Sequence, residues 1–140
     1  MLSLDDAGQL LRRSAFFRST SASAIRALSD HSKLMRLPAG ELLFKKGDPG
    51  SAMYFIVDGC VQVHHAEMVV ILLERGEVFG EAAALSSETR TASVSARTDT
   101  VLLKLERDAI YATLASHPDA VRSMIEALCH RESEVIGEKL

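Results

Sequence analysis

Cysteine is scarce in this chain, and its two copies lie far apart. Cys60 falls in a strand-like pattern and Cys129 in a helical one, and there are no others. Two isolated thiols give no basis for a disulfide framework, a zinc site or an iron–sulfur cluster. The cysteine content therefore predicts a protein of a reducing compartment.

The sequence also lacks a membrane segment, a secretion signal and a basic run. No apolar stretch approaches the ~20 residues of a membrane-spanning helix, and the residues after Met1 lack the basic start and apolar run of a signal peptide. The 16 lysines and arginines are spread along a chain of net charge −3. We therefore expect a cytoplasmic, soluble segment that inserts into no membrane and binds no nucleic acid by itself.

What the sequence does contain is enough apolar residues for one core. With 140 residues and 47% hydrophobic content, a single domain over residues 1–140 is expected. Periodicity divides it into a helical start at about 3–31, a strand-rich middle at about 33–106 and a helical end at about 107–138. This order predicts an α+β fold, an antiparallel, jelly-roll-like β-roll flanked by N-terminal and C-terminal helices.

The strands of the middle part are predicted from short β-rich runs separated by glycine-bearing turns. One run is continuously apolar, which predicts a central strand buried on both faces. His64 and His65 are adjacent, so on a strand they point to opposite faces and do not chelate one metal. The predicted strands are Lys33 to Leu37, Glu41 to Phe44, Met53 to Val57, Val61 to His65, the apolar run Met68 to Leu73, Thr91 to Ala96, and Thr100 to Leu105.

One segment of the strand-rich part has the pattern of an anion site. A short helix is predicted from Gly80 to Leu85, because glycine permits a tight entry and the glutamate and alanines that follow favour helix. The first turn of a helix leaves backbone N–H groups unpaired, and an anion is stabilised there. Arg90 follows a few residues later, and its forked guanidinium matches two phosphate oxygens. Helix and arginine together predict a phosphate site; the alternative is an ordinary strand-edge arginine paired with a carboxylate such as Glu81.

These residues carry a family resemblance. Phe79-Gly80-Glu81 followed by Arg90-Thr91-Ala92 resembles the phosphate-binding cassette of cyclic-nucleotide-binding domains, here residues 79–92. Three earlier segments also resemble the family: Pro38-Ala39-Gly40-Glu41, Gly47-Asp48-Pro49-Gly50 and Tyr54-Phe55-Ile56-Val57-Asp58-Gly59.

The resemblance implies a role for each residue of the cassette. Glu81 is expected to accept a hydrogen bond from the ribose 2'-hydroxyl, and Arg90 to pair with the exocyclic phosphate oxygens. Backbone N–H groups around Gly80, Ala82 and Ala92 complete the cradle. The Thr91 hydroxyl would contact the phosphate or a purine above it, and cAMP is placed ahead of cGMP. The implied chemistry is binding, without catalysis, metal or cofactor.

The loop between helix and arginine departs from the family pattern. Family members often have glycine two or three residues before the arginine and proline directly before it, where this chain has Ser86-Ser87-Glu88-Thr89. Glu88 adds negative charge, and Ala82 is smaller than the apolar residue usual at its position. Both features are expected to weaken binding.

Three further residues are candidates with two interpretations each. Arg131 projects from the apolar stripe of the last helix either as a snorkelling side chain or, as in the catabolite-activator branch, as a residue of a lid that reaches the ligand. Val70 and Leu72 either pack in the core or also contact the ribose or base.

Several functions and partners follow from these patterns. The first is a regulatory domain that binds cAMP or cGMP and relays binding through its C-terminal helix. The second is the sensing half of a catabolite-activator-like transcription regulator, since the chain stops inside a helical pattern before Leu140. A channel, kinase or transporter parent fits equally. A cupin-like metal enzyme ranks last, because the paired histidines lack alternating spacing. The apolar stripe of the last helix either packs on the roll or forms a homodimer.

Overall fold

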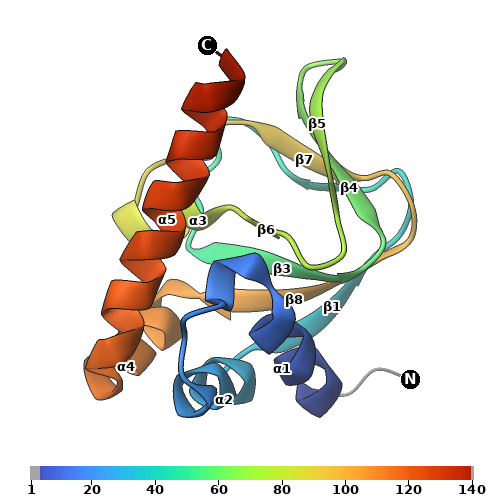
Figure 1. Cartoon of the computed structure of the whole chain (residues 1–140). Coiled ribbons are helices and arrows are strands. Elements are labelled where there is room, and N and C mark those ends of the chain that lie inside the picture. The colour runs from blue at the N-terminus through green and yellow to red at the C-terminus, as the bar shows by residue number, and fades with distance from the viewer. Residues whose placement is uncertain (1–3, 140) are drawn as a thin grey trace.

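The computed structural model describes residues 4–139 of the chain, with the side chains of residue 6 and residues 8–129. Helices at both ends flank a strand-rich middle, as the periodicity predicts (Figure 1). The elements are α1 (Leu4–Arg13), the 3-10 helix η1 (Ala15–Phe17), α2 (Ala22–Asp30), β1 (Lys33–Leu37), β2 (Leu42–Phe44), β3 (Ala52–Asp58), β4 (Cys60–His65), β5 (Met68–Glu74), β6 (Val78–Phe79), α3 (Glu81–Ser86), β7 (Ser93–Ala96), β8 (Thr100–Glu106), α4 (Arg107–Ser116) and α5 (Pro118–Lys139).

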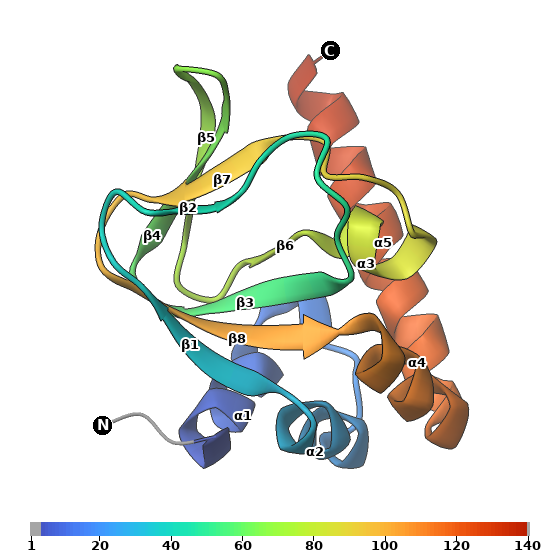
Figure 2. The same ribbon diagram turned by 180° about the vertical axis from the view of Figure 1, so that it is seen from behind.

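The strands form two antiparallel sheets that close on each other as a roll. One sheet has the order β1-β8-β3-β6 and the other the order β2-β7-β4-β5. Figure 2 shows the roll from behind, with β2 and β7 in one sheet and β1, β8 and β3 in the other. The predicted α+β roll with flanking helices is confirmed. The two-residue strand β6 was missed, since Val78 and Phe79 are too short a run to show a period.

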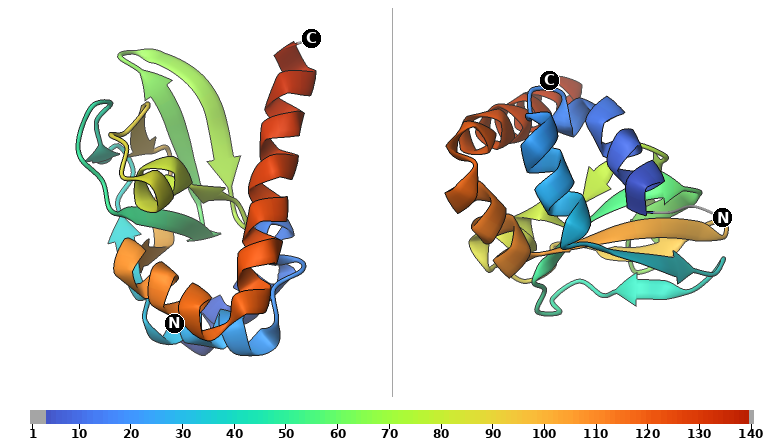
Figure 3. Two further views of the ribbon diagram at one scale, coloured as in Figure 1. Left: turned by 90° about the vertical axis from the view of Figure 1, so that its left-hand side faces the viewer. Right: turned by 90° about the horizontal axis from the view of Figure 1, so that it is seen from below.

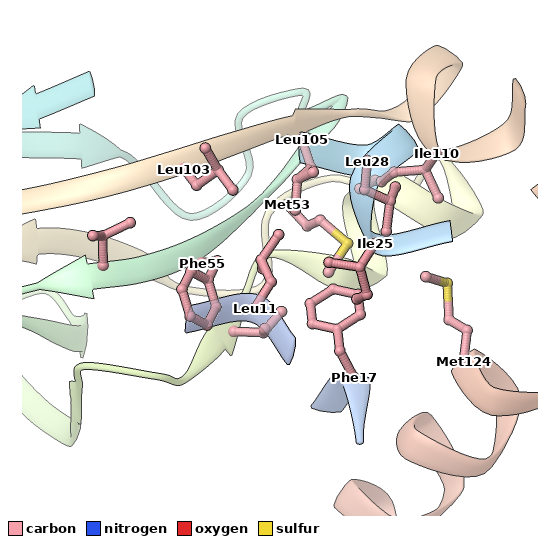
Figure 4. Packing of buried hydrophobic residues seen from close by; sticks show 13 residues of the cluster. Leu11, Phe17, Ile25, Leu28, Met53, Phe55, Leu103, Leu105, Ile110 and Met124 are labelled. Atoms are coloured by element: carbon pink, nitrogen blue, oxygen red, sulfur yellow. The ribbon is translucent and has the colours of Figure 1, made fainter. Parts of the chain in front are cut away.

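Strand β3 separates the two hydrophobic cores of the molecule. Its side chains alternate, so Met53 and Phe55 belong to the core between the sheet and the helices, whereas Tyr54 and Ile56 belong to the core inside the roll. Six consecutive residues of β3 are therefore buried. The first core joins the sheet to both helical ends, and Figure 4 labels its Leu11, Phe17, Ile25, Leu28, Met53, Phe55, Leu103, Leu105, Ile110 and Met124.

Strand β5 contradicts the prediction that Met68 to Leu73 forms a central strand buried on both faces. It is the last strand of its sheet, and six of its seven residues are exposed. Met68 is 73% exposed and only Leu73 is buried. The prediction was wrong because a run of apolar residues reports hydrophobicity and does not report how many neighbours a strand has. The hairpin of β4 and β5 extends away from the rest of the roll (Figure 1).

The C-terminal helices lie along one side of the roll. The left panel of Figure 3 shows α5 standing beside the strands, and the right panel shows α1 and α2 under the sheet of β1, β8 and β3. A hydrogen bond between the Thr20 and Ser123 hydroxyls, 3.0 Å apart, joins α5 to the N-terminal segment. Met124 packs in the first core, whereas Val121 and Ile125 are exposed. Within the described chain, no helix combines the length and apolar character that crossing a bilayer requires.

Candidate functional site

A cavity of about 690 Å³ opens between the roll and the helical ends. Its floor is the inner surface of the roll, and its walls come from the segment Phe79 to Ala83 with Thr89 to Ala92 and from η1 and α5. Segments far apart in sequence therefore meet at one place. The apolar floor consists of Phe44, Val63, Ile71, Leu73, Phe79 and Val94.

Helix α3 starts the wall of the cavity that the sequence predicts as a phosphate site. Gly80 precedes it with φ of 79°, a left-handed conformation that favours glycine. A Cβ at Gly80 would also lie 2.7 Å from Nη1 of Arg90. Backbone geometry and space thus both require glycine here. The predicted helix from Gly80 to Leu85 is observed as Glu81–Ser86.

Arg90 is the buried cation of the cavity. It is 5% exposed, its Nη1 donates to the Gly80 carbonyl at 3.1 Å, and its Nη2 donates to the Ala52 carbonyl at 2.9 Å. Its Cζ lies 4.1 Å from the centre of the Phe44 ring. Nε is buried and has no hydrogen-bond partner among the described residues. The guanidinium is buried, and both of these hydrogen bonds go to backbone carbonyls.

Burial lowers the pKa of Arg90 below its usual value, because the charged form loses solvation. The nearby Tyr54, Glu106, Asp48 and Glu81 act in the opposite direction. An arginine stays charged at any physiological pH. The site therefore presents a poorly solvated positive charge to the cavity.

The loop before β3 contacts Arg90 through its backbone and through Gly50. The backbone N–H of Arg90 donates to the Asp48 carbonyl at 2.8 Å, and that of Gly47 donates to the Arg90 carbonyl at 2.7 Å. A Cβ at Gly50 would lie 2.2 Å from Nε of Arg90. Phe44, Gly50 and Ala52 are thus site residues whose role sequence reasoning missed, because only folding brings them to Arg90.

The structure brings most predicted site residues to the cavity. Phe79, Gly80, Glu81, Ala82, Arg90, Thr91 and Ala92 all line it. Glu81 is half-buried and Thr91 is exposed. Glu88, which was expected to add negative charge near the site, is exposed and does not line the cavity.

The register of β5 contradicts the prediction that Val70 and Leu72 pack in the core or contact the ligand. Ile71 pairs with Val63 and Leu73 with Val61, and these pairs face into the roll. Val70 and Leu72 are 56% and 41% exposed and do not line the cavity. The prediction assigned Val70 and Leu72 to the inner face of the strand, which Ile71 and Leu73 occupy. Successive strand side chains point to opposite faces, and an all-apolar run does not show which face is inside.

The lid arginine, Arg131, falls in α5, but its side chain lies outside those described. Nearer the start of α5, Ser123, Glu126 and Ala127 line the cavity. Arg18 adds a second cation from the segment after η1. The described part of the C-terminal helix therefore contributes to the cavity wall.

Comparison with known sequences gives a family and two kinds of relative. The family model described as "Cyclic nucleotide-binding domain" matches residues 34–117. The CRP-like cAMP-activated global transcriptional regulator of Mycobacterium tuberculosis is 26% identical over 128 residues, 88% of this chain and 57% of the regulator. A voltage-gated inwardly rectifying potassium channel of Rattus norvegicus is 32% identical over 111 residues, 78% of this chain and 12% of the channel.

Among solved structures, the N-terminal domain of a transcriptional regulator from Streptomyces coelicolor A3(2) has a similar fold. Its TM-score is 0.79 with 25% sequence identity, and the match covers 94% of this chain and 95% of that one. This chain spans just over half the length of the mycobacterial regulator, 57%.

Proposed function

The chain belongs to the family of cyclic nucleotide-binding domains, which are regulatory and non-catalytic, because the family model matches residues 34–117. On this basis we propose that its cavity binds cAMP. The ligand contacts that we propose are those of the cassette, together with the residues that β5 turns into the cavity. They are Phe79, Gly80, Glu81, Ala82, Arg90, Thr91 and Ala92, with Ile71 and Leu73.

The position of Arg90 carries this proposal. A cyclic phosphate diester bears one negative charge, and a guanidinium pairs with such oxygens through parallel N–H groups. Arg90 is 5% exposed, borders the cavity and keeps Nε without a partner among the described residues. A buried charge is unfavourable until an opposite charge joins it, so an anion that enters here is stabilised.

The rest of the ligand fits the remaining surface of the cavity. The Glu81 carboxylate accepts a hydrogen bond from the ribose 2'-hydroxyl, and backbone N–H groups around Gly80, Ala82 and Ala92 donate to the phosphate oxygens. The ribose and base contact the apolar floor at Ile71 and Leu73. A volume of about 690 Å³ lies within the range of small-molecule sites, roughly 300–1,000 Å³.

We place cAMP ahead of cGMP as the ligand. Thr91 lies at the cavity with an exposed side chain, and its hydroxyl is available to the phosphate or to a purine above it. That contact suits either nucleotide. The mycobacterial relative is described as cAMP-activated, which supports cAMP.

We propose that ligand binding is relayed through α5. Ser123, Glu126 and Ala127 line the same cavity, so a ligand there changes the surroundings of the helix. A ligand shifts the equilibrium between two positions of α5 only by its difference in affinity for the two positions.

The effector that we propose is the DNA-binding part of a catabolite-activator-like regulator. The regulator relatives support it, and a channel parent is the alternative. A helix-turn-helix encoded downstream of residue 140 would support the regulator. Membrane-spanning helices encoded upstream of residue 1 would support the channel.

Isothermal titration of the purified chain with cAMP and cGMP tests the ligand. We expect saturable binding of cAMP that is tighter than binding of cGMP. The exposed Arg97, just after β7, provides the matched control, because Arg97→Ala removes a guanidinium outside the cavity. The absence of a binding signal at millimolar concentrations of both nucleotides would overturn the proposal.

A further inference from the structure

The first residue of α4 contacts α3 and the loop before β3, and it does not line the cavity. Arg107 is half-buried. Its Nε donates to the Ala84 carbonyl at 2.6 Å, and its Nη2 donates to the Ala83 carbonyl at 2.8 Å and the Gly50 carbonyl at 3.0 Å. A single side chain thus joins α4, α3 and the loop before β3.

These contacts satisfy the end of a very short helix. The last four carbonyls of a helix have no partner within it, and a cation near them is also stabilised by the negative end of the helix dipole. Tyr111, one turn after Arg107, donates its hydroxyl to the Leu85 carbonyl. Three consecutive carbonyls of α3 are therefore bound by α4. We name Arg107 and Tyr111 the carbonyl clamp.

The third contact of Arg107 is with Gly50, which lies beside the Arg90 side chain. Gly50, whose carbonyl Arg107 binds, lies so close to Nε of Arg90 that a Cβ would be 2.2 Å from it. The backbone N–H of Arg107 also donates to the Ser51 carbonyl at 2.7 Å. Arg107 therefore contacts two of the segments that lie beside the Arg90 guanidinium, which are α3 and Gly50.

We propose that Arg107 is a positioning residue of the phosphate site, which fixes α3 and Gly50 around Arg90 and makes the geometry of the site depend on the position of α4. This inference rests on the proposed function and names a residue that acts through Arg90 without touching the ligand. Because α5 follows α4 directly, a displacement of the C-terminal helices would reach the phosphate through this side chain.

Hydrogen–deuterium exchange of the unliganded protein tests the clamp without any nucleotide. In Arg107→Gln we expect the amides of residues 84–86 to exchange about tenfold faster, since the bonds that close the end of α3 are lost. The amides of α2 should keep their rates. Arg26→Gln, at an exposed position on α2, is the matched control and should change neither. Unchanged exchange in α3 of Arg107→Gln would overturn the inference.

A double-mutant cycle with Arg90 tests the link to the ligand. We expect Arg107→Gln to weaken cAMP about tenfold in the wild-type background, and less than about twofold when Arg90→Ala is already present. Arg107→Lys should restore only part of the affinity, because an ammonium lacks the fork that reaches three carbonyls. Equal losses in both backgrounds would show a general destabilisation and overturn the inference. If the wild type binds no cyclic nucleotide, the proposed function fails while the exchange experiment still decides the clamp.

Discussion

At the scale of the residue, the environment of Arg90 decides what the site can do. Its two terminal nitrogens donate to backbone carbonyls, the Phe44 ring lies against its face, and Nε has no partner among the described residues. A side chain that is already held in this way needs little reordering to receive an anion. The protein therefore supplies a preorganised positive charge.

Arg90→Ala should lower cAMP affinity at least tenfold, because a charge-assisted pair with a poorly solvated phosphate contributes about 1.5–3 kcal/mol. Titration calorimetry measures this loss, and Arg97→Ala should keep wild-type affinity. A circular-dichroism melt of each variant shows whether it is folded. Wild-type affinity in a folded Arg90→Ala would assign Arg90 a structural role only.

Gly50→Ala tests whether the loop before β3 supports the guanidinium. The added Cβ would lie 2.2 Å from Nε, and Arg90 has to move because carbonyls hold its other end. We expect cAMP affinity to fall by about tenfold.

Gly40→Ala is the comparison for this change. Gly40 has φ of 86°, and a Cβ there would have no other atom within 4 Å, so the substitution strains the backbone without touching Arg90. Its melting temperature should fall while its affinity stays unchanged. Equal affinities in the two alanine variants would show that Gly50 does not support Arg90.

At the scale of the element, β3 and β5 show that an apolar strand takes its role from its neighbours. Both are seven residues long and rich in apolar side chains. β3 lies between β8 and β6 with a core on each face, whereas β5 pairs with β4 alone and is mostly exposed. The part of β5 that matters for the site is the face it turns inward.

Adjacent residues of β5 provide a matched test of that face. Ile71 and Leu72 are 47% and 41% exposed, but only Ile71 lines the cavity. Ile71→Ser should weaken cAMP about three- to tenfold through lost apolar contact, and Leu72→Ser should leave the affinity unchanged. A larger loss in Leu72→Ser would reverse the assignment of the inner face.

At the scale of the whole molecule, the cavity joins the roll to both helical ends. Bound ligand should therefore stabilise the complete fold. At 100 times its Kd, cAMP should add about 2.7 kcal/mol to the free energy of unfolding and raise Tm by roughly 8 °C. Thermal denaturation with and without cAMP measures the shift. Arg90→Ala at the same cAMP concentration should show a much smaller Tm shift. Equal Tm shifts in both proteins would show that the stabilisation does not arise at this site.

The exposed apolar residues of α5 lead to an expectation about assembly. Val121 and Ile125 are 39% and 54% exposed, while Met124 between them is buried. We expect a second copy to cover this side of α5 at micromolar concentration, and Ile125→Glu to dissociate the pair. Sedimentation velocity distinguishes the two states. A wild-type chain that is monomeric throughout this range would show that these side chains stay in water.

The sequence alone determined the order of the longer elements and located the segment that we propose as the phosphate site. Helical and strand periods are local, so the strands at Lys33 to Leu37 and Thr100 to Leu105 and the helix starting at Pro118 were predicted close to their observed bounds. Phe79 to Glu81 and Arg90 are close in sequence and carry their own chemistry. The family match and the cavity then support the same segment as the site.

Only the tertiary structure decided which distant residues complete that site. The sheet order placed β5 at an edge and turned Ile71 inward, which no property of an all-apolar run determines. Gly50 and Arg107 lie 40 and 17 residues from Arg90, and their roles arise from contacts that exist only once the roll closes and α4 docks. Periodicity records which residues avoid water, whereas partners are set by packing between segments that the sequence keeps apart.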